Sequence, residues 1–160
     1  MSYLIEIKLE GGDPNKATPE IIQEREVAIF DLLEKNAFAI PKETNFVGPY
    51  RLNLRIFERR LVFGVFNSDR ERIVEFQLSL VPFQQVVKDY FKICKSYLEA
   101  VNRLSPSKIE TIDMARRGIH GEGARVLQER LEGKVELDND TARRLFTLIC
   151  VLHYGDWFEG

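Results

Sequence analysis

The sequence predicts an α+β fold in which a four-stranded, mostly antiparallel sheet is packed on one face by about five helices. Segments with alternating apolar and polar residues fall before residue 82, apart from one early helix, and segments with helical spacing follow. The run Leu145 to Leu152 is apolar except for Thr147. Because a helix that is apolar on every side must be enclosed, this run predicts a buried central helix in a C-terminal helical subdomain.

Four segments have the two-residue period of half-buried strands. In the first, Tyr3, Ile5, Ile7 and Leu9 alternate with polar-rich positions and are expected on the inner face. The other three, at 51–57, 61–66 and 73–80, are separated by tight turns at 58–60 and 67–70. Since such short connections join only antiparallel neighbours, these three predict a meander with one buried face.

The remaining segments have helical spacing and recognisable ends. Helices are expected at 19–36, after Thr18 as a cap, and from Pro82 to about Leu104. Ser107 and Glu110 have the spacing of a capping box, so a helix should restart there. Arg116-Arg117-Gly118 is typical of a helix end, which makes 118–123 a junction before a further helix at 124–131. The central helix follows Asp138, and the tail with Trp157 and Phe158 is expected to dock on the body.

Length and charge limit the function. A chain of 160 residues predicts a single domain, with a strand-rich part at 1–81 and a helical part at 82–160. The net charge of −2 makes nucleic acid an unlikely partner and gives no general attraction to anionic membranes. There is no signal-like segment and no membrane-length apolar run, so a cytoplasmic protein without a membrane partner is expected.

Cysteine and histidine are scarce and scattered. Cys94 and Cys150 fall within apolar helical stripes and are expected to be buried free thiols. With His120 and His153 they are all the cysteines and histidines of the chain, and only Cys150 and His153 are close in sequence. We therefore predict no metal site and no cofactor.

The junction at 113–123 is the strongest candidate binding surface. Arg116, Arg117 and His120 lie among three glycines, and Arg143 and Arg144 begin the central helix. Guanidinium groups beside a helix start could hold a phosphate or carboxylate, so we predict a binding or regulatory protein for a small anion or a protein partner. The alternative is structural: the arginines only finish a helix and Glu122 caps the next one.

Three other functions remain open. A small enzyme could use His120 with Asp113 or Glu122 as general acid and base on an anionic substrate, although no motif specifies a reaction. The face carrying Arg51, Asn53 and Arg55 could bind single-stranded nucleic acid, but is more simply a solvated sheet face. A purely structural interaction protein is the third possibility. The binding or regulatory protein predicted above could also form a homodimer.

Three runs carry a resemblance to a known family. They are Ser105 to His120, Asp140 to Cys150 and Val27 to Leu33, read as SPSKIETIDMARRGIH, DTARRLFTLIC and VAIFDLL. The chain resembles uncharacterised protein family 0262, small cytoplasmic proteins of alphaproteobacteria. The resemblance covers nearly the whole chain and is most specific in the C-terminal third. It implies no activity, because the family has no assigned function.

Overall fold

The computed structural model describes residues 2–10, 19–41 and 48–153. Thr18, Trp157 and Phe158 lie outside these ranges. The elements are, in chain order, β1 (Leu4–Glu10), α1 (Pro19–Glu34), β2 (Phe38–Ala39), β3 (Tyr50–Phe57), β4 (Arg60–Phe66), β5 (Arg72–Ser79), a short 3-10 turn (Val81–Phe83), α2 (Gln84–Val101), α3 (Pro106–Leu131), β6 (Glu136–Leu137) and α4 (Asn139–His153).

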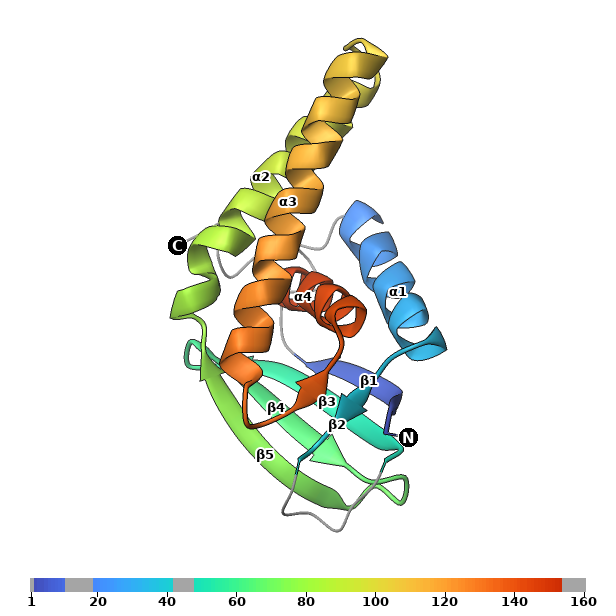
Figure 1. The fold of residues 1–160 in the computed structure, drawn as a ribbon, viewed down its shortest axis with the longest axis vertical. Coiled ribbons are helices and arrows are strands. Elements are labelled where there is room, and N and C mark those ends of the chain that lie inside the picture. Colours follow the sequence, from blue (N-terminus) through green and yellow to red (C-terminus); the bar gives the residue numbers. More distant parts are fainter. Residues whose placement is uncertain (1, 11–18, 42–47, 154–160) are drawn as a thin grey trace.

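The main sheet is mixed, with strand order β1-β3-β4-β5. The meander of β3, β4 and β5 is antiparallel, as predicted from its short turns. β1 instead pairs parallel with β3, because α1 lies between them in sequence and provides the long crossover that a parallel pair requires. A separate two-stranded sheet joins β2 to β6 (Figure 1).

The predicted inner face of the first strand is wrong at its start. Leu4 and Ile7 are buried, whereas Tyr3 and Ile5 are 43% and 37% exposed. The pairing of β1 with β3 shifts register between Leu4 and Glu6, as in a β-bulge. One additional residue in the strand exchanges the two faces, so strict alternation cannot continue through Ile5.

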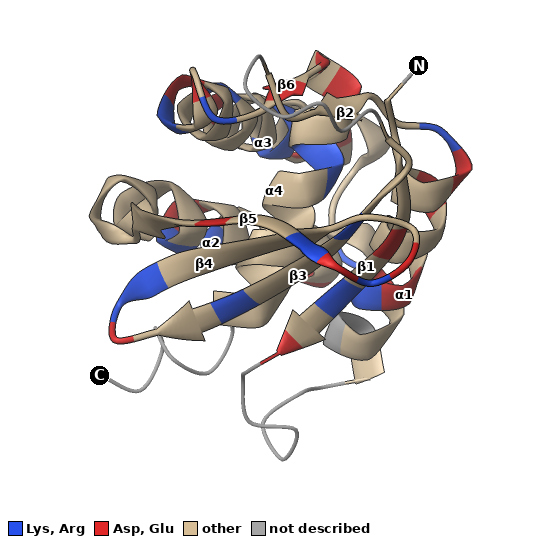
Figure 2. Ribbon diagram, turned by 90° about the horizontal axis from the view of Figure 1, so that it is seen from below, with Lys and Arg blue, Asp and Glu red and all other residues tan. Residues whose placement is uncertain are grey.

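Helices cover one face of the sheet (Figures 1 and 2). The inner face is apolar, and its centre is formed by the neighbouring residues Leu54, Phe63 and Phe76. The rings of Phe63 and Phe76 stack with centroids 4.9 Å apart. The hydrophobic cluster extends from these strands into α1, α2, α3 and α4, so strands and helices share one core.

The central helix is confirmed as α4. Leu145, Phe146, Leu148 and Ile149 are completely buried. At its start, the Asp138 carboxylate accepts a hydrogen bond from the Thr141 amide at 2.9 Å, as expected of a cap. The buried Thr141 hydroxyl in turn accepts from the Ala37 amide at 3.0 Å, which fixes the beginning of α4 against the chain entering β2.

The predicted junction at 118–123 is wrong. α3 runs without interruption from Pro106 to Leu131, through Gly118, Gly121 and Gly123. Its N-cap is Ser105, which accepts from the Lys108 amide, and not Ser107. The described part of the chain therefore has four α-helices, where about five were predicted. No helix within the described ranges is long and apolar enough to cross a bilayer.

Candidate functional site

Three helices line an open cavity of about 230 Å³ on the surface. α2 contributes Tyr90; α3 contributes Arg116, Arg117 and His120; α4 contributes Arg143 and Thr147. Four of the five residues predicted to bind a ligand therefore line one cavity, although the backbone beside them is a continuous helix and not a glycine-rich loop.

The glycines of α3 bring α4 close enough to form this cavity. Gly123 lies against the ring of Phe146, and a Cβ atom at this position would overlap that ring. Two residues earlier, a Cβ at Gly121 would lie 3.1 Å from a guanidinium nitrogen of Arg143. Since neither glycine presents a side chain to α4, Arg143 can extend along the surface of α3 toward His120.

His120 is held by a hydrogen bond and by aromatic rings. Its Nε2 lies 2.7 Å from the Thr147 hydroxyl, which donates to the Arg143 carbonyl at 3.3 Å. A hydroxyl has a single proton, so the tautomer protonated on Nε2 satisfies both contacts. The rings of Tyr90 and Phe146 lie 5.4 and 5.7 Å from the imidazole, centroid to centroid, and fix its orientation.

The environment keeps His120 neutral. Burial, followed by the charges of Arg143 and Arg116, lowers its pKa from the ordinary 6.5 to about 4. At neutral pH the imidazole therefore contributes a hydrogen-bonding group to the cavity but no charge. The positive charge comes from the three arginines alone.

The three arginines differ in their pairing. Asp113 binds two of them, with 2.6 Å to Arg116 and 3.1 Å to Arg117. Arg116 also lies over the ring of Tyr97, 4.5 Å from its centroid. Arg143 forms no salt bridge with any described residue. Three guanidinium groups outnumber the two nearby carboxylates, Asp113 and Glu24, of which Glu24 accepts from the Tyr90 hydroxyl at 3.0 Å, and so leave a net positive charge at the cavity.

Arg144 does not reach the cavity. It donates to the Lys35 carbonyl at 3.1 Å, and so contacts the end of α1. Consecutive residues of a helix are about 100° apart, which explains why Arg143 and Arg144 separate. The prediction that both line one site is therefore wrong for Arg144.

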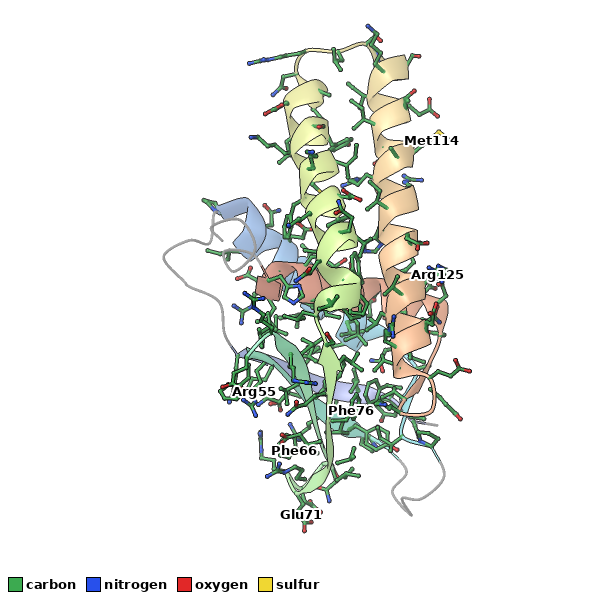
Figure 3. All side chains as sticks on the ribbon, turned by 90° about the vertical axis from the view of Figure 1, so that its left-hand side faces the viewer. Arg55, Phe66, Glu71, Phe76, Met114 and Arg125 are labelled. Atoms are coloured by element: carbon green, nitrogen blue, oxygen red, sulfur yellow. The ribbon has the colours of Figure 1, made fainter. Side chains whose placement is uncertain are left out.

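The structure does not assemble the predicted acid–base pair. Asp113 and His120 are seven residues apart on one helix, which corresponds to about 10 Å along its axis. Glu122 is exposed and binds Arg125 at 2.7 Å, and this pair lowers the pKa of Glu122. In Figure 3, Arg125 extends from the side of α3 that faces away from α2. Neither carboxylate lies at His120.

Two residues of the cavity were not predicted. Thr147 was visible as the only polar residue in the apolar run of the central helix, and a buried hydroxyl requires a partner. Tyr90 gave no such signal, because a tyrosine on an apolar stripe is ordinary core. Its hydroxyl donates to Glu24 at 3.0 Å, and burial raises its pKa above the ordinary value.

The other candidate sites are not assembled as binding centres. Among the described residues, no group of three or more His, Cys, Asp or Glu side chains could hold a metal ion. Cys150 is buried and Cys94 half-buried, and burial raises the pKa of both thiols, that of Cys94 to about 11.

The outer sheet face is occupied by ion pairs. Arg51 binds Glu6, and Arg55 lies 3.8 Å from Glu75. Asn53 donates to Glu10 at 3.2 Å. Figure 2 shows acidic and basic residues interspersed along these strands. Paired charges do not form the continuous positive surface that single-stranded nucleic acid needs.

The fold and this cavity define a small α+β protein with a cation-lined cavity between three helices. Residues 1–155 match the model of the Uncharacterised protein family (UPF0262), and the chain belongs to this family. No solved structure matches the chain.

Curated relatives match over almost their whole length. A UPF0262 protein of Ruegeria pomeroyi is 62% identical over 158 residues, covering 97% of this chain and 98% of its own. Those of a Jannaschia species and of Cereibacter sphaeroides are 61% and 62% identical, covering 97% of this chain and 99% and 100% of theirs. The names of these relatives assign no activity.

Proposed function

We propose that the protein is a binding or regulatory domain that takes a small carboxylate or phosphate compound in the cavity between α2, α3 and α4. The observation that carries the proposal is Arg143, a half-buried cation at the cavity without a carboxylate partner among the described residues. A guanidinium group removed from water is stabilised by an oxyanion that accepts both of its parallel N–H groups.

The neighbours of Arg143 favour binding over catalysis. Arg116 and Arg117 already share Asp113, so they supply a positive field and retain part of their hydrogen-bonding capacity. His120 is neutral, with a pKa of about 4, and lacks a carboxylate partner, so it is a weak base and no acid at neutral pH. The enzyme alternative thus lacks its proton-transfer pair.

The two unpaired cysteines favour a reducing compartment, and we propose the cytoplasm.

The adjacent arginines of α4 provide a matched test. Arg143→Gln and Arg144→Gln remove the same charge from neighbouring positions, but only Arg143 lines the cavity. Inorganic phosphate and citrate serve as probes, in titration calorimetry at constant ionic strength. We expect Arg143→Gln to weaken binding by about 10-fold or more, as loss of a charge-assisted hydrogen bond of about 1.5–3 kcal/mol implies. Arg144→Gln should stay within about twofold of wild type, because a remote surface charge is screened by salt.

Two outcomes would contradict an anion site at this cavity. Equal loss in the two variants would indicate a diffuse response to net charge and not a site. Absence of heat with either probe at millimolar concentration, together with an unchanged melting temperature, would overturn anion binding at this cavity.

A further inference from the structure

Two apolar surfaces lie away from the cation-lined cavity. The first, here called the distal hairpin, comprises residues 92–108, where α2 and α3 project beyond the rest of the molecule (Figure 1). The apolar stripe of α2 continues into it: Val87 is fully buried near the sheet, whereas Leu98 and Val101 are 57% and 45% exposed. Leu104, at the tip, is 41% exposed. The stripe therefore extends beyond the core that covers its first half.

The second surface is the outer face of α1. Ile22, Val27 and Phe30 are 46%, 51% and 67% exposed. Phe30 also lines a shallow hollow of about 610 Å³, together with Ile29, Leu33, Glu26 and Glu34. Exposed apolar side chains gathered on one face of a helix, with charged residues beside them, are typical of an interaction surface.

The charges of the two surfaces are complementary. The distal hairpin carries Lys92, Lys95, Arg103 and Lys108 against Glu99 alone, a formal charge of +3. The exposed charged side chains of α1 are Glu26, Asp31 and Glu34 against Arg25, a formal charge of −2 among the side chains that the structure describes. Because one apolar patch is surrounded by positive charges and the other by negative charges, the hairpin attracts α1 of another copy, whereas two hairpins or two α1 faces repel one another.

We propose that the distal hairpin of one copy packs on α1 of a second copy, and that the contact is reciprocal in a twofold dimer. A single hairpin-to-α1 contact would leave one of each surface uncovered and could continue into a chain of molecules. A twofold axis closes the assembly, because each copy then supplies one hairpin and receives one. α1 lies near the point where α2 and α3 leave the rest of the molecule, below the distal hairpin (Figures 1 and 3). One partner molecule could therefore contact both surfaces.

Single substitutions on each surface test the dimer. The full chain is examined by sedimentation equilibrium, as wild type, Leu98→Glu and Phe30→Glu. We expect a dimer for wild type and at least a tenfold larger dissociation constant for each variant, because each replaces an apolar side chain of the contact with a charged one that must lose water on association. Met114→Glu is the control. Met114 is 65% exposed, lies on α3 outside the distal hairpin and extends from the side of α3 that faces away from α2 (Figure 3), so this variant should remain dimeric.

A mixture of the two variants tests whether the hairpin of one copy contacts α1 of the other. In a heterodimer of Leu98→Glu with Phe30→Glu, one contact pairs an intact hairpin with an intact α1, so mixing should restore dimers. In an interface of hairpin against hairpin, Phe30→Glu would remain dimeric by itself, because its hairpins are intact, and its addition would not restore dimers to Leu98→Glu. Absence of rescue, dimers unaffected by Phe30→Glu, or a wild type that stays monomeric at hundreds of micromolar would each overturn the proposal.

Discussion

At the scale of the residue, the three glycines of α3 have three different surroundings. A Cβ atom at Gly118 would meet nothing within 4 Å, whereas at Gly121 it would press on the Arg143 guanidinium and at Gly123 it would overlap the Phe146 ring. Only Gly123 is required by packing, since an aromatic ring in a filled core cannot yield as a flexible side chain does. The glycines therefore permit close approach of α4 and do not break the helix.

Two alanine substitutions separate these roles. Gly118→Ala should raise the free energy of unfolding by about 0.5–1 kcal/mol, because alanine is the better helix former and the methyl group has space. Gly123→Ala should lower it by about 1–3 kcal/mol, because overpacking outweighs the same gain in helix propensity. Urea unfolding measures both. If Gly123→Ala were as stabilising as Gly118→Ala, α3 and α4 could not be packed as closely as described.

At the scale of the element, the turn between β3 and β4 departs from favoured turn chemistry. Glu58 and Arg59 both have positive φ angles, 49° and 61°. A two-residue hairpin loop of this kind matches the twist of the strands, but it favours Asn-Gly, because other residues are strained in the left-handed region. The hairpin is therefore held by its strands and not by its turn.

Replacing this turn should stabilise the hairpin. We expect Glu58→Asn with Arg59→Gly to raise the free energy of unfolding by about 0.5–1 kcal/mol, since relief of strain exceeds the entropy that glycine adds to the unfolded chain. Arg60→Gly is the control. Arg60 is exposed within β4, so glycine there should cost about 0.5–1 kcal/mol. Thermal unfolding followed by circular dichroism would decide, and destabilisation by the Asn-Gly turn would contradict the assigned geometry.

At the scale of the whole molecule, one core buries groups that titrate on both sides of neutrality. Burial lowers the pKa of His120 to about 4 and that of His153 to about 3. Burial also raises the pKa values of Cys94, Cys150 and Tyr90. All five groups are therefore neutral in the folded protein near pH 7, and charging any of them opposes folding.

Stability should have a plateau between about pH 6.5 and pH 9. As the pH falls from 6.5 toward 4, the two histidines become protonated in the unfolded chain but stay neutral in the folded protein. The free energy of unfolding therefore decreases until the pH has passed the folded pKa values of the histidines. As the pH rises above 9, unfolded thiols lose protons that folded thiols retain, so stability decreases again. Urea unfolding across this range should give a curve with two descending limbs.

One variant and one NMR measurement test whether the two buried histidines cause the loss of stability at acid pH. His153→Leu should make the acid limb shallower and leave the basic limb unchanged, because it removes one of the two buried histidines. The chain has two histidines, so the proton spectrum contains two sets of imidazole signals. Neither should shift between pH 7.5 and pH 5. A normal titration midpoint near 6.5 would show that the imidazoles are not buried as described.

Features that depend on near neighbours in sequence could be predicted. The meander was predicted from alternating residues and short turns, and the burial of α4 from the apolar run Leu145 to Leu152. The candidate site was predicted in part, because cations and His120 stood out by type. Arg144 was wrongly included and Tyr90 was missed, since each assignment depends on which way a side chain leaves its helix.

The sequence by itself determined the fold class, the meander and the buried central helix, because a repeat of two or 3.6 residues fixes which face of an element is apolar. The tertiary structure decided the parallel pairing of β1, the continuity of α3 and the meeting of Arg143 with His120. These depend on segments far apart in the chain. Gly123 illustrates the reason: alone it reads as a helix breaker, and only the ring of Phe146 packed against it explains why a glycine is needed within a helix.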